Sequence, residues 1–438
     1  MKGYVFMRLA DIFTDHMVLQ RDREICIFGT GKGEGIIEFL GEKKSFISDS
    51  ESFCVYLPPM NAGGPYEMRI TLNGVLQVLS DIMVGDVYLA CGQSNMELTL
   101  AQTTEIEYIH NQNIRFFTEP VGADEDGNPL YNKNDWFVCE GKEVDRFSAI
   151  GYYFATELQK HSGVPIGVVS CSKGASRVDA WTSPEYVNTE EYQKMVEVKH
   201  LDYSVYKFNH NSWLYKNKLL NIVPFANSGV LWYQGESNRC SQEAVHYDKM
   251  LRIMIENWRE LWNCNIPFYF VQLMPYNESP DVAAWQIIRN KQETASKTIP
   301  NTYLVTLVDT GESYEIHPQN KKTVSVALAN AVRNVQFGDN VEYCGPIFEK
   351  YNLTENGVEI IFSHSEGLHI KGEELLDLYA YNSKNELITI DYEIANEKLR
   401  LFWENKPVKI ALGYRNAPYH NLYNNSDYLA SPFCLELQ

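Results

Sequence analysis

The sequence has no long uninterrupted apolar run. A membrane-spanning helix needs about 20 consecutive, mostly apolar residues, and no stretch of the 438 residues approaches that length. The apolar run near the N-terminus, Gly3–Met7, is shorter than the core of a signal peptide. We therefore expect a soluble protein with no membrane partner and no signal peptide in this sequence. The compartment stays open: the cytoplasm, or the periplasm or exterior if a signal has been removed.

Cysteines are few and are not arranged in closely spaced pairs. The nine cysteines are scattered from Cys26 to Cys434, and no Cys-x-x-Cys pair occurs. This spacing gives no zinc framework. An odd number of scattered cysteines in a chain of this size favours buried free thiols. We therefore expect thiols and no metal site.

Positive charge is also in short supply. The chain has 38 Lys and Arg against 57 Asp and Glu, a net charge of −19. Nucleic acids and anionic membranes attract basic surfaces, so they are poor candidate partners for this chain. The apolar fraction of 45% is ordinary for a globular protein, and the aromatic fraction of 13% suits β-structure and sugar binding. The length predicts two or three domains.

The order of predicted elements divides the chain into three parts. Residues 1–80 contain short apolar stretches separated by Gly, Pro, Asn and Asp, which is typical of a small β-sandwich. Residues 81–337 alternate apolar strands with helices, which predicts a parallel sheet covered on both faces. Residues 338–438 return to strands and form a second β-module.

The individual elements follow from hydrophobic periodicity. In the two outer parts, strands are expected at 24–28, 35–39, 53–57, 67–72, 358–362, 376–381, 398–402 and 408–412. In the central part, strands are expected at 84–90, 164–170, 229–233, 268–273 and 302–308. Helices are expected there at 147–160, 213–225, 244–261, 283–298 and 321–335.

Four of the central strands end in polar motifs. The motifs are Cys91–Asn95, Cys171–Ser176, Gln234–Asn238 and Asp309–Pro318. Parallel α/β sheets bind ligands just beyond the carboxyl ends of their strands. We therefore expect all four motifs to meet at one rim of the sheet.

Together these motifs contain the groups that acyl transfer requires. The hydroxyl of Ser94 is a weak nucleophile and needs a base, and His317 is the histidine that follows a strand in this pattern. A tetrahedral oxyanion needs donors, which the main-chain N–H groups of Ser94 and Gly174 and the side-chain amide of Asn238 could supply. Glycine at 174 lets the backbone approach without a Cβ.

These motifs resemble those of the SGNH hydrolase superfamily and, within it, the sialate O-acetylesterase family of carbohydrate esterases. The resemblance is carried by GQSNME at 92–97, WYQGESN at 232–238, DAWTS at 179–183 and EIHPQNK at 315–321. It extends to MVLQRD at 17–22 and to YRNAPYHNLYN and ASPF at 414–424 and 430–433. It implies an α/β fold with an SGNH three-layer parallel-sheet core, flanked by N- and C-terminal β-sandwich modules.

By the same resemblance Ser94 is the nucleophile, His317 the general base, and Ser94, Gly174 and Asn238 the oxyanion donors, with no metal or cofactor. The chain departs from the pattern in two places. The superfamily's Asp three residues before the histidine is Tyr314 here, and the closer family's Asp two residues before it is Glu315. We assign Glu315 to orient His317, with Glu312, Asp309 and a backbone carbonyl as alternatives.

The second departure lies in the glycine motif. The usual Gly-Gly-Thr is Gly174-Ala175-Ser176 here, flanked by Lys173 and Arg177. Arg177 is a candidate ligand of a sialic-acid carboxylate, because guanidinium binds carboxylate in a bidentate way; the alternative is a structural ion pair. Gln93 and Glu236 are candidate substrate-binding residues, with structural roles as their alternatives.

Each assignment also has a purely structural alternative. Ser94 could cap the following helix, His317 could begin a helix before Pro318, and Asn238 could form a turn. Trp181 and Trp232 are expected in the core rather than stacked on a sugar.

The sequence thus predicts a serine esterase that removes O-acetyl groups from carbohydrate, with an acetylated glycan as its partner. Sialate is the favoured sugar and acetylated xylan the alternative. A rival of another class is a carbohydrate-binding protein with a decayed esterase site. The oligomeric state is left open.

Overall fold

The computed structural model describes residues 7–49, 51–104, 106–120, 134–196, 206–277 and 284–437. Most of the short apolar run at the N-terminus and residue 283, the expected start of a helix, lie outside them. The chain divides into two compact units. The first unit contains residues 1–194, 198–234 and 250–268, and the second contains 195–197, 235–249 and 269–438.

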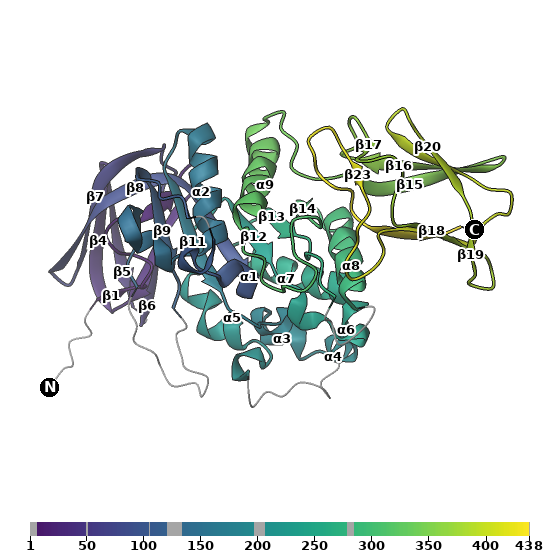
Figure 1. The fold of residues 1–438 in the computed structure, drawn as a ribbon. Coiled ribbons are helices and arrows are strands. Elements are labelled where there is room, and N and C mark those ends of the chain that lie inside the picture. The colour runs from purple at the N-terminus through teal and green to yellow at the C-terminus, as the bar shows by residue number, and fades with distance from the viewer. Residues whose placement is uncertain are drawn as a thin grey trace. The chain divides into compact units, whose positions relative to one another are not determined.

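The first unit begins with strands and continues as a mixed α/β structure (Figure 1). Its strands are β1 (Arg8–Leu9), β2 (Val18–Gln20), β3 (Ile25–Thr30), β4 (Gly33–Phe39), β5 (Glu42–Ser48), β6 (Ser52–Leu57), β7 (Gly63–Leu72), β8 (Val75–Gly92), β9 (Asn111–Thr118), β10 (Phe137–Cys139), β11 (Ile166–Ser172) and β12 (Gly229–Tyr233). Its helices are α1 (Ser94–Glu97), α2 (Ala149–Ser162), α3 (Pro184–Val187) and α5 (Trp213–Asn217). The unit boundaries pass through α4 (Glu190–Met195) and α7 (Tyr247–Leu261).

Strand β8 joins the two kinds of structure in the first unit. Its first part pairs antiparallel with β7, and residues Met83–Gly85 pair in parallel with β2. Its last part, Asp86–Gly92, pairs in parallel with β11 on one side and, from Tyr88 onward, with β12 on the other. The sequence predicted only residues 84–90, because that segment is buried on both faces while residues 75–81 are largely exposed.

The parallel sheet of the first unit runs in the order β10-β9-β11-β8-β12. Strands β11, β8 and β12 are parallel, as expected. Strand β9, which the sequence analysis did not predict, is parallel to β11, and β10 is antiparallel to β9. Every residue of β11 and β12 is buried. Strands β8, β11 and β12 end level with one another, because Gly92 pairs with Ser172 and with Tyr233. Three of the four polar motifs therefore begin at the same edge of this sheet.

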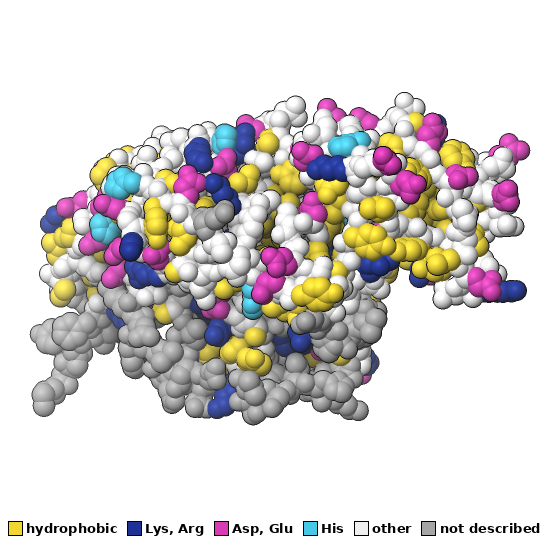
Figure 2. Space-filling view, in the orientation of Figure 1, with side chains coloured by type: hydrophobic (Ala, Val, Ile, Leu, Met, Phe, Trp, Pro, Cys, Tyr) yellow, Lys and Arg dark blue, Asp and Glu magenta, His cyan; other side chains and the backbone are white. Residues whose placement is uncertain are grey.

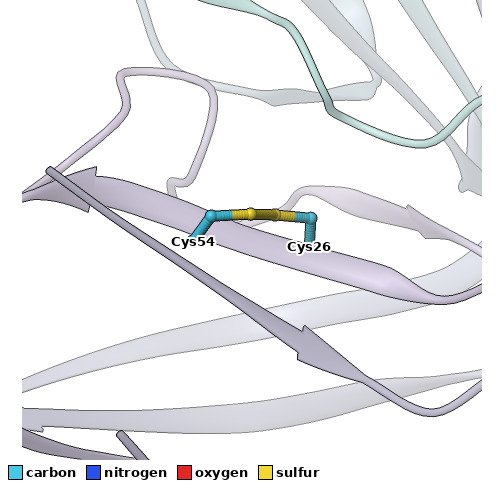
Figure 3. Close-up of a disulfide and its surroundings, with 2 residues drawn as sticks. All are labelled: Cys26 and Cys54. Carbon is cyan, nitrogen blue, oxygen red and sulfur yellow. A yellow bond between two sulfur atoms is a disulfide. The ribbon is translucent and has the colours of Figure 1, made fainter. Parts of the chain in front are cut away.

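One cysteine prediction is wrong. Cys26 and Cys54 form a disulfide between the antiparallel strands β3 and β6 (Figure 3). The pairing depends on the register of two strands 28 residues apart in sequence, which cysteine spacing alone does not reveal. Of the other seven, Cys91, Cys139, Cys171 and Cys344 are buried thiols, as expected, and three are half-buried.

The second unit contains helices, a short strand pair and then a β-module (Figure 1). Its strands are β13 (Phe268–Val271), whose first residue belongs to the first unit, β14 (Thr302–Val305), β15 (Ile347–Thr354), β16 (Gly357–Ser363), β17 (His369–Ile370), β18 (Leu378–Tyr381), β19 (Leu387–Ile388), β20 (Asp391–Ala395), β21 (Lys398–Phe402), β22 (Lys409–Leu412), β23 (Leu422–Tyr423) and β24 (Phe433–Glu436). Its helices are α6 (Ser241–Ala244), α8 (Ala284–Thr298) and α9 (Lys322–Val332), the last followed by a π-helical turn at Arg333–Phe337.

The β-module of the second unit has its own hydrophobic core. Two four-stranded antiparallel sheets, β15-β16-β21-β20 and β19-β18-β22-β24, supply it. The buried cluster contains Val358, Ile360, Leu399 and Leu401 from the first sheet, and residues such as Ile410 and Phe433 from the second. The sequence therefore predicted correctly that this part is built from strands, although it missed β15, β17, β19, β20, β23 and β24.

Two further features concern the helices and the surface. The helix expected at 213–225 is wrong: α5 ends at Asn217, a 3-10 turn occupies Leu219–Asn221, and Pro224 follows, which cannot donate a helical hydrogen bond. Within the described segments, no helix combines the length and the apolarity needed to cross a membrane. On the face shown in Figure 2, acidic and basic side chains are interspersed.

Candidate functional site

The edge at which β8 ends is built around a glycine. Gly92 has φ of +132°, and a Cβ on it would lie 2.1 Å from the carbonyl oxygen of Tyr233. A side chain is therefore excluded by both conformation and space. The chain then turns: the N–H of Gln93 donates to the carbonyl of Tyr233 at 2.9 Å, and α1 begins at the next residue.

Ser94 is the first residue of α1. The N-cap position is occupied by Gln93, so the alternative in which Ser94 caps this helix is wrong. Ser94 is half-buried, whereas residues 91–93 and 95–96 around it are buried. The buried side chain of Gln93 accepts a hydrogen bond from Gln234 Nε2 at 3.2 Å, which joins the first and third motifs.

The glycine motif folds back onto the same edge. The N–H of Lys173 donates to the carbonyl of Gly92 at 3.0 Å, and Ala175 has φ of +57°, which is uncommon for a residue with a Cβ. Asn209 holds this turn. Its Nδ2 donates to the carbonyl of Ala175 at 2.8 Å, and its Oδ1 accepts from the N–H of Arg177 at 2.9 Å.

Gly174, a predicted oxyanion donor, lies against α1. Its N–H donates to Glu97 Oε2 at 2.5 Å. A Cβ built on Gly174 would lie 3.6 Å from the Cβ of Ser94. The first unit therefore brings together the predicted nucleophile, one predicted oxyanion donor and a carboxylate that the sequence analysis did not assign.

Arg177 does not extend from the protein surface. Its side chain is 2% exposed and forms an ion pair with the fully buried Asp179, at 3.3 Å between Nε and Oδ1. Trp181 is also fully buried and donates from Nε1 to Ser176 Oγ at 2.9 Å. Trp181 and Trp232 pack edge to face, so both belong to the core, as predicted.

The third motif continues into the second unit. Gly235 has φ of +149°, and a Cβ on it would lie 3.0 Å from a side-chain carbon of Ile288. Glu236 and Asn238 then form a short 3-10 turn and are both buried. Both side chains therefore lie inside the protein rather than on its surface.

His317 has charged neighbours within the second unit. Glu315 Oε1 accepts from the main-chain N–H of His317 at 2.7 Å. Burial lowers the pKa of His317, the positive charge of Lys321 lowers it further, and the negative charge of Glu315 opposes both. Burial also lowers the pKa of Lys321 to about 8, against the negative charges of Glu236 and Glu315.

The other acids considered for orienting His317 have different surroundings. Asp309 Oδ2 accepts from the hydroxyl of Tyr423 at 3.2 Å, and burial raises the pKa of Asp309. Glu312 contributes its main-chain carbonyl, which accepts from the N–H of Glu315 at 3.0 Å. Tyr314, at the superfamily's acidic position, is 72% exposed.

Three residues near the predicted groups were missed by sequence reasoning: Glu97, Asn209 and Lys321. Glu97 belongs to the quoted motif GQSNME and Lys321 to EIHPQNK. Their closeness in sequence to Ser94 and His317 could have identified them as candidate site residues. Asn209 gave no such signal: it ends the short 3-10 turn Lys207–Asn209, outside all of the quoted motifs. Among the described residues, no group of three or more His, Cys, Asp or Glu side chains could hold a metal ion.

Comparison with known proteins places this chain among carbohydrate esterases. Residues 84–334 match the model of a family described as carbohydrate esterase, sialic acid-specific acetylesterase. Sialate O-acetylesterase of Mus musculus is 25% identical over 438 residues, covering 84% of this chain and 80% of that protein. The Homo sapiens enzyme is 26% identical, covering 79% of this chain and 74% of that protein.

A solved structure gives a similar result over the whole chain. The crystal structure of a carbohydrate acetylesterase from Xanthomonas citri superposes with a TM-score of 0.89 and is 27% identical in sequence. The superposition covers 99% of this chain and 100% of that chain. The similarity therefore includes the outer β-structure as well as the region that the family model matches.

Proposed function

This chain belongs to the sialic acid-specific acetylesterase family of carbohydrate esterases, and we propose that it removes acetyl groups from carbohydrate hydroxyls with Ser94 as its nucleophile. The observation that carries the proposal is the position of Ser94. It is the half-buried first residue of a helix that begins directly beyond the central strand of a parallel sheet. Ligands bind such sheets at this edge.

The proposed reaction has two steps. Ser94 Oγ attacks the acetyl carbonyl carbon while His317 takes the hydroxyl proton. The tetrahedral intermediate then collapses, the bond to the sugar oxygen breaks, and His317 returns the proton to that oxygen. In the second step His317 takes a proton from water, the resulting nucleophile attacks the acetyl-serine, and acetate leaves as Ser94 regains its proton.

The oxyanion is proposed to form hydrogen bonds with the main-chain N–H groups of Ser94 and Gly174 and with the side chain of Asn238. Losing one such donor typically costs about 3–4 kcal/mol of transition-state stabilisation. The proximity of Gly174 to Ser94 within the first unit supports its assignment.

The supporting roles are proposed as follows. Glu315 is proposed to orient His317, through the contact of its carboxylate with the main-chain N–H of that residue. Gln93 and Glu236 are proposed to shape the substrate site. For Arg177, the ion pair with Asp179 favours a structural role over contact with a substrate carboxylate.

The proposed substrate is an O-acetylated sialic acid, because the family is described as sialic acid-specific and relatives in two mammals are sialate O-acetylesterases. An acetylated plant polysaccharide is the alternative, and the Xanthomonas citri structure is named only as a carbohydrate acetylesterase.

The finer fold assignment is likewise proposed: an SGNH three-layer core at 81–337 between β-sandwich modules at 1–80 and 338–438. The parallel register of β9, β11, β8 and β12 supports it.

The test is acetate release from 9-O-acetylated sialic acid and from acetylated xylooligosaccharides, measured for the wild type and for Ser94→Ala. We expect release by the wild type and a loss of about 10³-fold or more in the variant, because a nucleophile knockout leaves only binding and oxyanion stabilisation. The sugar that the wild type prefers identifies the substrate class.

Ser162→Ala, at the far end of α2, is the matched control and is expected to keep full activity. A fluorophosphonate probe adds a second readout, since labelling of the wild type that disappears in Ser94→Ala identifies the nucleophile. Binding of glycans without acetate release or labelling would contradict the esterase and support the rival binding protein.

A further inference from the structure

The main-chain N–H of Gly174 already has an anionic acceptor. It donates to Glu97 Oε2 at 2.5 Å, across 77 positions of sequence. A hydrogen bond from an amide to a carboxylate is charge-assisted and roughly twice as strong as one between neutral groups. The proposed oxyanion donor is therefore occupied by a negative charge of the protein itself.

Glu97 and the nucleophile belong to the same helical turn. Ser94 and Glu97 are the first and last residues of α1, so they lie three positions apart, a spacing that places side chains on one face. A Cβ built on Gly174 would lie 2.8 Å from Glu97 Oε2 and 3.6 Å from Ser94 Cβ. All three residues therefore border one small volume, which is where an acetyl carbonyl bound to Ser94 needs its oxyanion donor.

We propose that the Glu97 carboxylate is a resident anion in the oxyanion hole, which the acetyl oxygen must displace before Ser94 can be acylated. This inference rests on the proposed function, in which Gly174 supplies an oxyanion donor. One N–H proton cannot serve two negative oxygens at full strength. Acylation therefore requires the carboxylate to move away and to find another donor.

Because the displaced carboxylate needs another hydrogen-bond donor, Glu97 makes the enzyme favour some acetyl esters over others. Hydroxyl groups adjacent to the acetyl group of a sugar ester can donate to the displaced carboxylate. An aryl acetate such as 4-nitrophenyl acetate has no hydroxyl and leaves the carboxylate without that compensation. Glu97 therefore slows the reaction of simple acetyl esters more than that of acetylated sugars.

The experiment compares kcat/KM of the wild type, Glu97→Gln and Glu97→Ala for 4-nitrophenyl acetate and for the preferred acetylated sugar. With 4-nitrophenyl acetate we expect about a tenfold rise for Glu97→Ala and a smaller rise for Glu97→Gln, because a neutral amide competes for the Gly174 N–H less strongly than a charged carboxylate. With the sugar ester the rise is smaller, so selectivity for sugar falls. Added acetate inhibits Glu97→Ala more strongly than the wild type, because it can fill the vacated position.

Glu67→Gln is the matched control. Glu67 lies on β7. The next residue, Met68, pairs with Leu79 near the start of β8, and Leu79 is thirteen positions before Gly92. At about 3.3 Å per residue, thirteen residues of strand span up to roughly 40 Å, so we expect this variant to keep wild-type kinetics. If Glu97 merely supported the turn at Gly174, both Glu97 variants would lose activity on both esters, and the inference would be overturned.

A measurement that needs no catalysis separates this inference from the proposed function. In a ¹H–¹⁵N spectrum of ¹⁵N-glycine-labelled protein, the Gly174 amide proton should lie downfield and exchange slowly in the wild type. In Glu97→Ala it should move upfield and exchange faster. An amide signal that is the same in both proteins would contradict the contact. If the signal changes but the protein releases no acetate and reacts with no probe, the contact between Glu97 and Gly174 would be supported and the proposed esterase activity contradicted.

Discussion

At residue scale, the charge state of His317 depends on neighbours that pull in opposite directions. A general base must be neutral to accept a proton, so its pKa sets the acidic limb of the activity profile. Burial and the positive charge of Lys321 lower the pKa of His317, and Glu315 raises it. We therefore expect kcat/KM to stay high to a pH below the ordinary histidine value of about 6.5.

Replacing Lys321 with Met should move this limb. The substitution removes a positive charge that disfavours protonated His317, so the pKa of His317 rises and the acidic limb of kcat/KM shifts to higher pH. Activity at acidic pH therefore falls while activity on the alkaline plateau changes less. The measurement is a pH profile of kcat/KM for the wild type and Lys321→Met.

The neighbouring Lys322 provides the control. It is the exposed first residue of α9, whereas Lys321 is buried and is the lysine whose charge lowers the pKa of His317. Lys322→Met should keep the wild-type limb. A limb that stays in place in Lys321→Met, or moves to lower pH, would show that His317 does not set it.

The positions of the motifs could be predicted from the sequence, but the contacts between them could not. Short apolar strands followed by Gly and Ser or Asn mark the ends of β8, β11 and β12, and the structure has these ends level. The bond between Glu97 and Gly174 depends on a turn in which Ala175 takes positive φ and Asn209 holds two backbone groups. No local pattern encodes such an arrangement.

At element scale, Ser148 connects the helix that carries Ser94 to the long helix α2. Its Oγ accepts from the N–H of Gly151 at 3.1 Å, which makes it the N-cap of α2. The same hydroxyl donates to the carbonyl of Met96, in α1, at 2.7 Å. One buried hydroxyl therefore forms hydrogen bonds with backbone groups of both helices.

Ser148→Ala should lower the free energy of unfolding by about 1–3 kcal/mol, because the loss of an N-cap costs roughly 0.5–2 kcal/mol and a buried carbonyl also loses its donor. Urea denaturation followed by circular dichroism measures the change. Ser162→Ala, at the other end of α2, should stay within about 0.5 kcal/mol of the wild type. Equal effects of the two substitutions would contradict the role of Ser148.

Elements with strong periodicity were predicted well, and those held by tertiary contacts were not. Strand β12 has the predicted bounds, and α8 and β21 match over their described residues. The apolar residues of 213–225 suggested a helix, yet they are buried by short turns around Pro224. The exposed half of β8 was missed because antiparallel pairing with β7, rather than burial, defines it.

At the scale of the whole molecule, each unit contains a buried titratable group with a strongly shifted pKa. Burial raises the pKa of Glu119, in the first unit, to about 7. Burial lowers the pKa of His420, in the second unit, to about 4. Glu119 accepts from Asn221 Nδ2 at 2.9 Å, and His420 Nε2 lies 2.9 Å from the carbonyl oxygen of Ala430.

The two groups should give stability opposite dependences on pH. Between pH 4.5 and 7 the folded protein holds a proton on Glu119 that the unfolded chain releases, so stability falls as pH rises. Between pH 6.5 and 4 the unfolded chain protonates His420 and the folded protein does not, so stability falls as pH drops. Each shift corresponds to about 3 kcal/mol over its range.

Substitution separates the two contributions. Relative to the wild type, Glu119→Gln should gain stability as pH rises from 4.5 to 7, and His420→Gln should gain it as pH falls from 6.5 to 4. Urea unfolding at several pH values measures both differences. A difference that does not vary with pH would mean that the replaced group titrates alike in the folded and unfolded chain.

Strand β8 has a consequence for how this protein can be re-engineered. The same 18-residue strand pairs with β7 at its beginning and ends at the glycine before Gln93 and Ser94. A cut at residue 80 would divide this strand: residues 75–79 would stay paired with β7, while Ile82 and Val84 would lose their partners on β7. The N-terminal β-structure is therefore not an interchangeable module. Strand β2 also pairs with β8, so a chimaera joined anywhere between β2 and β8 would separate paired strands.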